Sequence, residues 1–498
     1  MLDVFAVFHD NPTVDLQTPT AGELSSRRPA GRSTVVNYAG RCFVRAKNRP
    51  ALGAKKRFQS FNRGDTINEL RVIEAHEHGI AREQISRAAL DTLEGLQAAG
   101  FRACLVGGAV RDLLLGVPPK DFDVATDAEP EQVVEVFGRK ARLIGRRFRI
   151  AHVRFGREIV EVSTFRADPG TSEPDADTRE LDDAGRVLRD NVFGSIAEDA
   201  RRRDFAINGL YYDIADDCVH DYVGGMDDVA ACRLRLIGDP AVRYREDPVR
   251  MIRAVRIAAK LGLTIDEPAR PPRELVGLLA DVPAARMFDE VLKLLMNPAG
   301  GRVFRMLREY GLFAPMFAQT AAVLDSPSGA ASEALIEQAI TNTAARIEAG
   351  KPVTPAFLFA ALLWPAVREH AAMLERDGMA PAPALASAQS AVVGEQIQRV
   401  SIPKRFSIPM REIWHLQPRF HRRRGKQPSR LIAHPRFRAA YDFLLLRAAV
   451  GEVEQELADW WTQAQNDPST PAPGSGAPAP AKSRKRRRGG RRRRSETV

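Results

Sequence analysis

The first regular pattern of apolar and polar positions along the chain lies just before Gly100. Its apolar residues recur every three or four positions, the spacing that puts side chains on one side of a helix. They are Ile80, Ile85, Ala88, Ala89, Leu93 and Leu96. This pattern predicts an amphipathic helix of about 15 residues that begins near Gly79 and ends at Gly100.

A strand, a glycine turn and a second helix are predicted after it. The apolar run over residues 101–106 precedes Gly107 and Gly108, and a largely apolar segment over 109–116 follows them. Glycines between a short apolar run and a helical pattern are typical of a tight strand-to-helix connection.

The following segment alternates between apolar and polar residues and predicts further strands. These strands cover residues 121–125, 151–155 and 158–165. Residues 166–189 are rich in Asp, Glu, Pro, Gly and Thr and predict a surface loop. Together with the first two helices, these strands predict a small mixed α/β unit.

From about Asp247 onwards the apolar positions follow helical spacing, and Pro, Gly and polar residues separate the segments. The predicted helices cover residues 248–261, 283–296, 301–310, 332–349, 355–374, 384–400 and 434–464. The predicted fold class is therefore α+β: a mixed α/β head followed by an all-α region, with disordered termini.

The length of 498 residues exceeds the size at which one hydrophobic core usually stops growing, so several domains are expected. Composition and periodicity predict their boundaries. They are a disordered leader over 1–65, a head over 80–240, a helical neck over 241–310, a helical body over 311–466, and a low-complexity linker with an arginine-rich tail over 467–498.

The positive charge of the chain is concentrated in that tail. The formal net charge is +11, but the segment from Lys482 to the C-terminus holds ten basic residues and a single acid, Glu496. The remaining 481 residues therefore carry a formal charge of only +2. A run of this kind favours sequence-independent contact with nucleic-acid phosphates.

The cysteine pattern and the apolar segments indicate the cellular compartment of the protein. The four cysteines are scattered without a CxxC pair, so neither a zinc site nor a disulfide framework is indicated. We expect no membrane span, and the first eight residues carry Asp3 and lack the basic start of a secretory signal. These features predict a cytoplasmic protein.

The candidate chemistry centres on Asp121 and Asp123. On a strand, residues i and i+2 point to the same face, so these carboxylates would lie a few ångströms apart. Such a pair suits hard Mg2+, and two-metal phosphoryl transfer needs it. Glu161, on the strand predicted over residues 158–165, is a candidate third acid that would lie on an adjacent strand of the sheet. The alternatives are an exposed turn for the aspartate pair and a salt-bridged strand residue for Glu161.

The glycine turn lies shortly before the acid pair in the sequence. Gly107 and Gly108 would let the backbone approach a triphosphate, and Arg111 follows one turn into the helix. A tight turn with no ligand is the alternative for the glycines alone. The combination of glycines, arginine and acids favours a nucleotide site.

Two later segments extend this site. Arg203, Asp204 and Asn208 offer a phosphate-binding cation, an acid that either joins the carboxylates or orients an arginine, and a sugar or phosphate contact. Asp247 and Arg250 lie three residues apart at the start of a predicted helix and could hydrogen-bond a base edge. Capping of the helix dipole by acids explains that second segment equally well.

Two arginine clusters are candidate RNA contacts. Arg422, Arg423 and Arg424 follow an aromatic residue, a mixture that suits phosphates and stacked bases, although a solvated basic loop is the alternative. The tail contributes further cations. They are Arg486, Arg487, Arg488, Arg491 and Arg492.

Five ordered motifs resemble those of the class II nucleotidyltransferases, the family of bacterial CCA-adding enzymes and poly(A) polymerases. They are LVGGAVRD at 105–112, PKDFDVAT at 119–126, EVSTFR at 161–166, RRDFAIN at 202–208 and EDPVR at 246–250. The resemblance runs from about Ile80 to Ala314. It implies a polymerase-β-like head followed by neck, body and tail helices.

The resemblance also implies roles for individual residues. Asp121, Asp123 and Glu161 would bind two catalytic Mg2+ ions, and Asp247 with Arg250 would select the base. Asp204 would be catalytic or nucleotide-orienting. The remaining nucleotide-binding positions are Gly107, Gly108, Arg111, Asp112, Arg203 and Asn208.

Three features favour the poly(A) polymerase branch of this family. Residues 143–153 and 190–195 are similar to the corresponding poly(A) polymerase segments, and the linker with its arginine-rich tail is similar too. The implied reaction is addition of AMP from ATP to RNA 3′ ends without a template, in RNA 3′-end processing and turnover. RNA-degradation factors and an RNA chaperone are further candidate partners. The alternatives are a CCA-adding enzyme acting on tRNA and a non-catalytic RNA-binding protein on the same scaffold.

Overall fold

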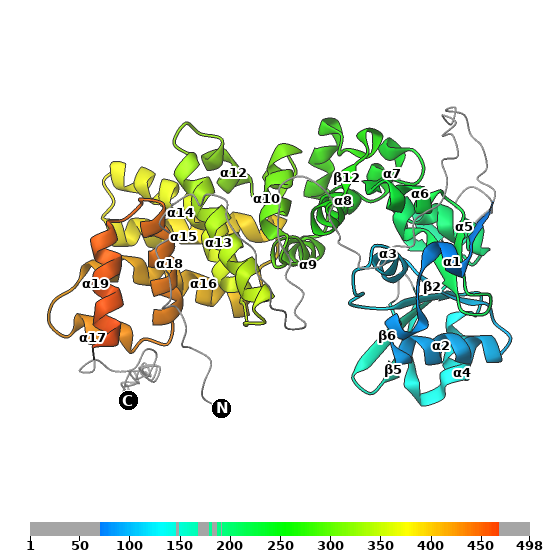
Figure 1. Ribbon diagram of the computed structural model, residues 1–498. Coiled ribbons are helices and arrows are strands. Elements are labelled where there is room, and N and C mark those ends of the chain that lie inside the picture. The colour runs from blue at the N-terminus through cyan, green and yellow to red at the C-terminus, as the bar shows by residue number, and fades with distance from the viewer. Residues whose placement is uncertain (1–69, 146–148, 168–178, 182–186, 191, 468–498) are drawn as a thin grey trace, which may run out of the picture. The chain divides into compact units, whose positions relative to one another are not determined.

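The computed structural model describes residues 70–145, 149–167, 179–181, 187–190 and 192–467, all within one compact unit, Val44–Val498 (Figure 1). The expected leader over 1–65 and the arginines at 486–492 lie outside these residues, as do almost all of the linker and the rest of the tail.

The head is built on one eight-stranded mixed sheet. In spatial order its strands are β1 (Arg71–Ile73), β10 (Cys218–Asp221), β9 (Leu210–Asp213), β2 (Ala103–Val106), β3 (Asp123–Thr126), β6 (Glu158–Thr164), β5 (Ile150–Phe155) and β4 (Ala141–Ile144). Neighbouring strands are antiparallel except for β3 and β6, which run parallel.

The two faces of this sheet are covered differently. Helices α2 (Arg87–Ala98) and α4 (Pro130–Phe137) pack on one face, where alternate strand residues such as Val124 and Val162 are buried (Figure 1). On the opposite face, α5 (Ile196–Arg202) covers only the half formed by β9, β2 and β3. Alternation of apolar residues along each strand places one set of side chains under each layer.

Most of the rest of the described chain is helical. The remaining α-helices are α1 (Ala75–His78), α3 (Gly108–Leu114), α6 (Gly225–Ala230), α7 (Pro240–Glu246), α8 (Val249–Leu261), α9 (Ala284–Leu295), α10 (Gly300–Glu309), α11 (Phe313–Met316), α12 (Ala318–Leu324), α13 (Ala330–Glu348), α14 (Pro355–Arg376), α15 (Pro381–Arg399), α16 (Lys404–Leu416), α17 (Gln427–Ile432), α18 (Phe437–Ala449) and α19 (Gln455–Asn466). A parallel pair, β11 (Arg233–Leu234) and β12 (Thr264–Ile265), lies at the start of this region. The predicted α+β class, with a mixed head and a helical remainder, is confirmed.

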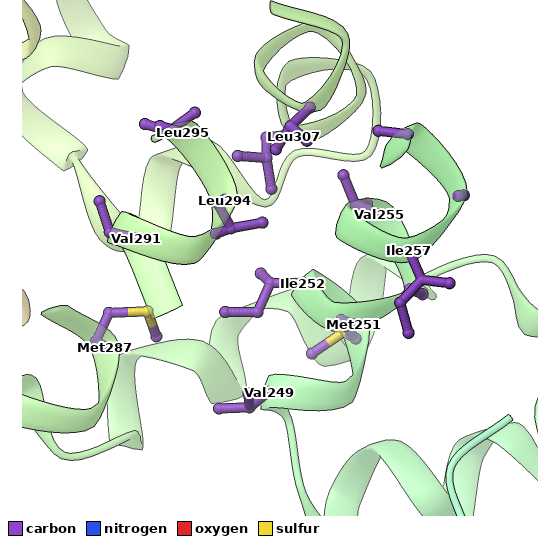
Figure 2. Packing of buried hydrophobic residues seen from close by; sticks show 14 of the residues in the cluster. Val249, Met251, Ile252, Val255, Ile257, Met287, Val291, Leu294, Leu295 and Leu307 are labelled. Carbon is purple, nitrogen blue, oxygen red and sulfur yellow. The ribbon is translucent and has the colours of Figure 1, made fainter. Parts of the chain in front are cut away.

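Helices α8, α9 and α10 pack against one another through an apolar interface next to the head. Figure 2 shows Ile252 of α8 pointing toward Leu294 of α9, with Leu307 of α10 close by, and all three side chains are fully buried. The apolar residues of α8 recur at helical spacing, so one side of this helix joins the interface while its arginines remain on another. This packing fixes the helix that carries Arg250 and Arg253.

Helix α14 is the one described helix that is long and apolar enough to cross a membrane by length and composition. Within its most apolar window, 61% of the residues are buried inside the protein. It packs against α12, α13, α15 and α16. These contacts make it the central helix of the body.

Four sequence predictions differ from the observed elements. The helix expected from Gly79 begins only at Arg87, because Ser86 caps it by accepting a hydrogen bond from the Ala89 N–H, 3.1 Å away. The loop expected over 166–189 contains a two-stranded antiparallel ribbon, β7 (Arg179–Leu181) and β8 (Val187–Asp190). Two further differences concern the last long helix and the acid pair.

The helix expected over 434–464 is two helices, α18 and α19. Gly451, between them, has a φ of +74°, a left-handed conformation that ends a helix. The strand expected over 121–125 begins at Asp123, so Asp121 precedes it, and the same-face argument does not apply to this residue.

Candidate active site

A tight turn between β2 and α3 brings two guanidinium groups together. Gly107 has φ +74° and ψ −131°, a conformation that L side chains rarely adopt. A Cβ on Gly107 would lie 3.5 Å from Nη1 of Arg203, and one on Gly108 would lie 3.4 Å from Nη2 of Arg111. The glycines therefore leave room for these two cations beside the backbone turn.

Arg203 is held in place by a buried carboxylate and a phenol. Its Nη2 and Nε donate to Asp199 Oδ2 at 2.9 and 3.2 Å, and its Nε also lies 2.9 Å from the Tyr211 hydroxyl. Tyr211 in turn donates to Asp199 at 2.6 Å. Although burial alone would lower it, Tyr211 and Asp199 raise the pKa of Arg203 above its ordinary value. Arg203 is thus a fixed cation whose remaining nitrogen, Nη1, lies next to Gly107.

Arg111 is also buried and oriented. Its Nε and Nη2 donate to Asp112 Oδ1 at 2.8 and 2.6 Å, and its Nη1 donates to Asn208 Oδ1 at 2.7 Å. Asp112 further lies 3.4 Å from Lys260 Nζ on α8. The structure therefore brings Arg203 and Asn208 next to the predicted residues of the glycine turn. The carboxylate of Asp112 contacts both Arg111 and Lys260.

Two of the candidate carboxylates lie next to each other on neighbouring strands and not on the same strand. Asp123 on β3 is paired in register with Glu161 on the parallel strand β6. Burial, followed by the negative charges of Glu161 and Asp121, raises the pKa of Asp123 to about 6, although Arg203 opposes this shift. Asp121 is 75% exposed and lies 3.8 Å from Lys120 Nζ.

This donor set fits a hard divalent cation. All three groups supply carboxylate oxygens, and a cation between them would offset both the burial and the negative charges that raise the pKa of Asp123. Glu161 also lies 3.4 Å from His152 Nε2. Among the described residues, no three His, Cys, Asp or Glu side chains already stand at metal-binding positions. The exposed Asp121 and Glu161 would have to rotate toward Asp123 to bind a metal together.

Asp204 belongs to a different part of the site. It is 8% exposed, its Oδ1 accepts from the Phe205 N–H at 2.8 Å and from Asn208 Nδ2 at 3.0 Å, and its Oδ2 lies 2.6 Å from Nη2 of Arg253. Burial alone would raise the pKa of Asp204, but Arg253 and these hydrogen bonds lower it below the ordinary value. The partners of Asp204 are thus Asn208 and an arginine of α8, contacts that suit an orienting residue, and its catalytic or orienting role remains a prediction.

Asp247 and Arg250, the predicted base-selecting pair, are each fixed by a charged neighbour. Asp247 Oδ2 accepts from Nη2 of Arg286 on α9 at 2.7 Å, and Arg250 Nη1 donates to Glu246 Oε2 at 2.9 Å. Asp247 is the residue that ends α7, so it does not lie on α8 with Arg250 as the sequence predicted.

Five residues that the structure places around this site were not predicted from the sequence: Asp199, Tyr211, Arg253, Lys260 and Arg286. Asp199 carried a readable signal, since it precedes Arg203 by four residues at the end of a helical segment. Arg286 carried none, because 39 residues separate it from Asp247.

The predicted RNA contact on the body is a short exposed segment after a single 3-10 turn, Gln417–His421. Arg422, Arg423 and Arg424 are exposed there, and Arg423 Nη1 lies 2.9 Å from Glu456 Oε1. Exposed guanidiniums of this kind are available to phosphates.

A mixed sheet with carboxylates on neighbouring strands, beside a glycine turn and a fixed arginine, is the arrangement expected of a nucleotidyltransferase. Family models match three parts of the chain: the poly A polymerase head domain at residues 103–235, the probable RNA and SrmB-binding site of polymerase A at 262–324, and the polymerase A arginine-rich C-terminus at 377–495. The poly(A) polymerase I of Salmonella typhi is 50% identical over 398 residues, which cover 79% of this chain and 85% of that protein. The chain therefore belongs to the bacterial poly(A) polymerase I family of enzymes.

CCA-adding enzymes are more distant relatives. The one from Geobacillus sp. is 35% identical over 226 residues, covering 45% of this chain and 53% of that protein. The crystal structure of the Bacillus stearothermophilus CCA-adding enzyme in complex with CTP aligns with a TM-score of 0.50 and 25% identity, over 76% of this chain and 81% of that one. The predicted family and its poly(A) polymerase branch are both confirmed, whereas the individual site residues remain predictions. Membership of a polymerase family also implies ATP as substrate, metal use and RNA binding.

Proposed function

We propose that this protein adds AMP from ATP to RNA 3′ ends without a template. The observation that carries this proposal is the facing pair Asp123 and Glu161, with Arg203 held on the other side of Asp123. Facing carboxylates with an adjacent fixed cation supply what nucleotidyl transfer needs: oxygen ligands for metal and a positive group for the triphosphate.

Each part of the site has a task in this reaction. Gly107 and Gly108 let the triphosphate approach the backbone, and Arg203 and Arg111 bind its phosphate oxygens. Asp121, Asp123 and Glu161 would hold two Mg2+ ions, which supply a lower pKa for the RNA 3′ hydroxyl and charge neutralisation for the leaving pyrophosphate. The 3′ oxygen attacks the α-phosphorus as the bond to pyrophosphate breaks.

The base would be read by the protein. Asp247 and Arg250 present a hydrogen-bond acceptor and donors, and Arg286 and Glu246 keep both side chains in one arrangement. A fixed acceptor–donor pair matches one base edge better than another. We propose that this pair selects adenine, and that the enzyme acts in the cytoplasm on RNA destined for 3′-end processing and turnover, where degradation factors or an RNA chaperone are candidate partners.

Primer extension tests the function. A single-stranded RNA is incubated with the full-length protein, Mg2+ and each nucleoside triphosphate separately. Long ladders with ATP alone support the proposal. Short additions that need both CTP and ATP, on a tRNA lacking its terminus, would instead identify a CCA-adding enzyme.

Removing Arg286 should loosen base selection. In Arg286→Ala, Asp247 loses the partner at 2.7 Å and can rotate, so we expect the preference for ATP over CTP, measured as the ratio of kcat/KM values, to fall roughly tenfold. Arg273→Ala removes an exposed arginine from the segment before α9 and serves as the control. An unchanged preference in Arg286→Ala would show that Asp247 does not depend on this ion pair.

A further inference from the structure

Half of one sheet face in the head has no helix over it in the described part of the chain. Of the described α-helices, α2 and α4 make the main contacts with β4, β5 and β6, and both cover the face on which Val160 and Val162 are buried. The other face of these three strands carries polar and half-exposed residues. They are Arg142, Ile144, Ile150, His152, Arg154, Ile159, Glu161 and Ser163.

The pairing of residues between neighbouring strands places Glu161 on this open face, in one row with Asp123. Asp123 is paired with Glu161, Glu161 with His152, and His152 with Arg142. Paired residues on neighbouring strands project from the same face, so the four side chains form one row across β3, β6, β5 and β4. The 3.4 Å approach of His152 Nε2 to Glu161 Oε1 agrees with this placement.

The geometry of the reaction indicates on which side of Asp123 the leaving pyrophosphate lies and on which side the attacking hydroxyl lies. In an in-line displacement, the attacking and leaving oxygens lie on opposite sides of the phosphorus. Arg203 and the glycine turn, which would bind the leaving pyrophosphate, lie on the β2 and β9 side of Asp123. The attacking hydroxyl must therefore approach from the side of Glu161, over β6, β5 and β4.

We propose that the open face of β4, β5 and β6 is the binding track for the 3′-terminal nucleotides of the RNA. This inference rests on the proposed function, since it places the RNA whose 3′ hydroxyl attacks the nucleotide in the same reaction. Three strand-to-strand spacings of about 4.8 Å separate Asp123 from Arg142. The resulting length of roughly 14 Å accommodates a few nucleotides, since a stacked strand rises about 3.4 Å per nucleotide along its axis.

The chemistry of the face matches single-stranded RNA. Arg142 and Arg154 are exposed, and neither has an ion-pair or hydrogen-bond partner within the described residues, so both are available to phosphates. Ile144 and Ile159 are 36% and 40% exposed, and they rank among the exposed large apolar side chains of the described chain. Cations for the backbone beside apolar surface for bases and riboses suit a strand that is bound without sequence readout.

The first test uses kinetics on the full-length protein. In the double variant R142A/R154A we expect the KM for RNA to rise about tenfold while the KM for ATP stays unchanged. The slope of log(kcat/KM) for RNA against log salt should become shallower by about 1.4, because two contacts to a single strand are lost. The control R87A/R139A removes the same charge from two other exposed positions, the first residue of α2 and the turn before β4, and should leave both KM values unchanged.

The second test locates the RNA 3′ end directly. An RNA with 4-thiouridine at its third-last position is irradiated with the wild-type chain, and cross-linked peptides are mapped by mass spectrometry. Cross-links to the residues of this face, within 142–144 or 150–163, support the track. Cross-links elsewhere overturn it, as does an unchanged KM for RNA in R142A/R154A, even if the wild type makes poly(A). If the wild type extends no RNA with any nucleotide, the proposed function fails, and the cross-links alone decide whether this face binds RNA.

Discussion

Asp123→Asn should lower the rate of AMP addition by about a thousandfold or more. The substitution removes the negative charge of the most buried member of the carboxylate group, and with it the electrostatic stabilisation on which phosphoryl transfer depends. The thermal midpoint of the metal-free protein should stay the same or rise, because burial and the neighbouring Glu161 already disfavour the charge of Asp123. Primer extension and thermal unfolding measure the two effects.

The control is Asp127→Asn, which makes the same chemical change directly after β3. Asp127 accepts a hydrogen bond from the Arg102 N–H at 2.8 Å, and the oxygen of asparagine can preserve it. We expect full activity from this variant. Retained activity in Asp123→Asn would sink the assignment of Asp123 as a metal ligand.

Asp204→Ala should destabilise the fold by about 1–3 kcal/mol, because Arg253 loses its carboxylate partner, although the 37% exposure of the Arg253 side chain lets water replace part of that interaction. The measurement is the shift of the unfolding midpoint in urea. The double variant Asp204→Leu with Arg253→Met removes both charges and should recover much of this loss, since apolar residues can replace a buried ion pair at little cost.

The same pair of variants separates the two roles considered for Asp204. If this residue orients Asn208 and α8, loss of activity should follow loss of stability. A stable but inactive Asp204→Ala protein would show that Asp204 takes part in the chemistry itself.

Local patterns predicted the elements that depend on local rules. The strand, glycine turn and helix over β2 and α3 follow from an apolar run and two glycines, and α8 begins and ends within a residue of its expected bounds. The start of α2 was placed too early, because Ile80 and Ile85 are buried at helical spacing without being helical. Burial alone cannot distinguish a helix from a segment that packs beside it.

The ribbon formed by β7 and β8 was not predicted, because a composition rich in Asp, Gly and Pro is also compatible with strands joined by a turn. The division between α18 and α19 was missed because helical composition continues on both sides of Gly451.

The parts of the site whose positions are set by turns and strand ends could be predicted from the sequence. The glycine turn, Asn208 and the arginines meet as expected because motif spacing fixes them relative to strand ends. The pairing of Asp247 with Arg286 was not predictable, because it depends on how α9 packs against α8 and not on any local pattern. The facing of Asp123 and Glu161 required knowledge that β3 and β6 are parallel neighbours.

The chain of contacts from Arg111 through Asn208 and Asp204 to Arg253 has a consequence for protein engineering. It joins groups of the head to α8 through hydrogen bonds and an ion pair of 2.6–3.0 Å. A chimera that exchanges the head for that of a CCA-adding relative at the boundary near residue 240 would cut this chain. Grafts that keep specificity should therefore carry α7, α8 and α9 together with the head and place the junction beyond Leu295.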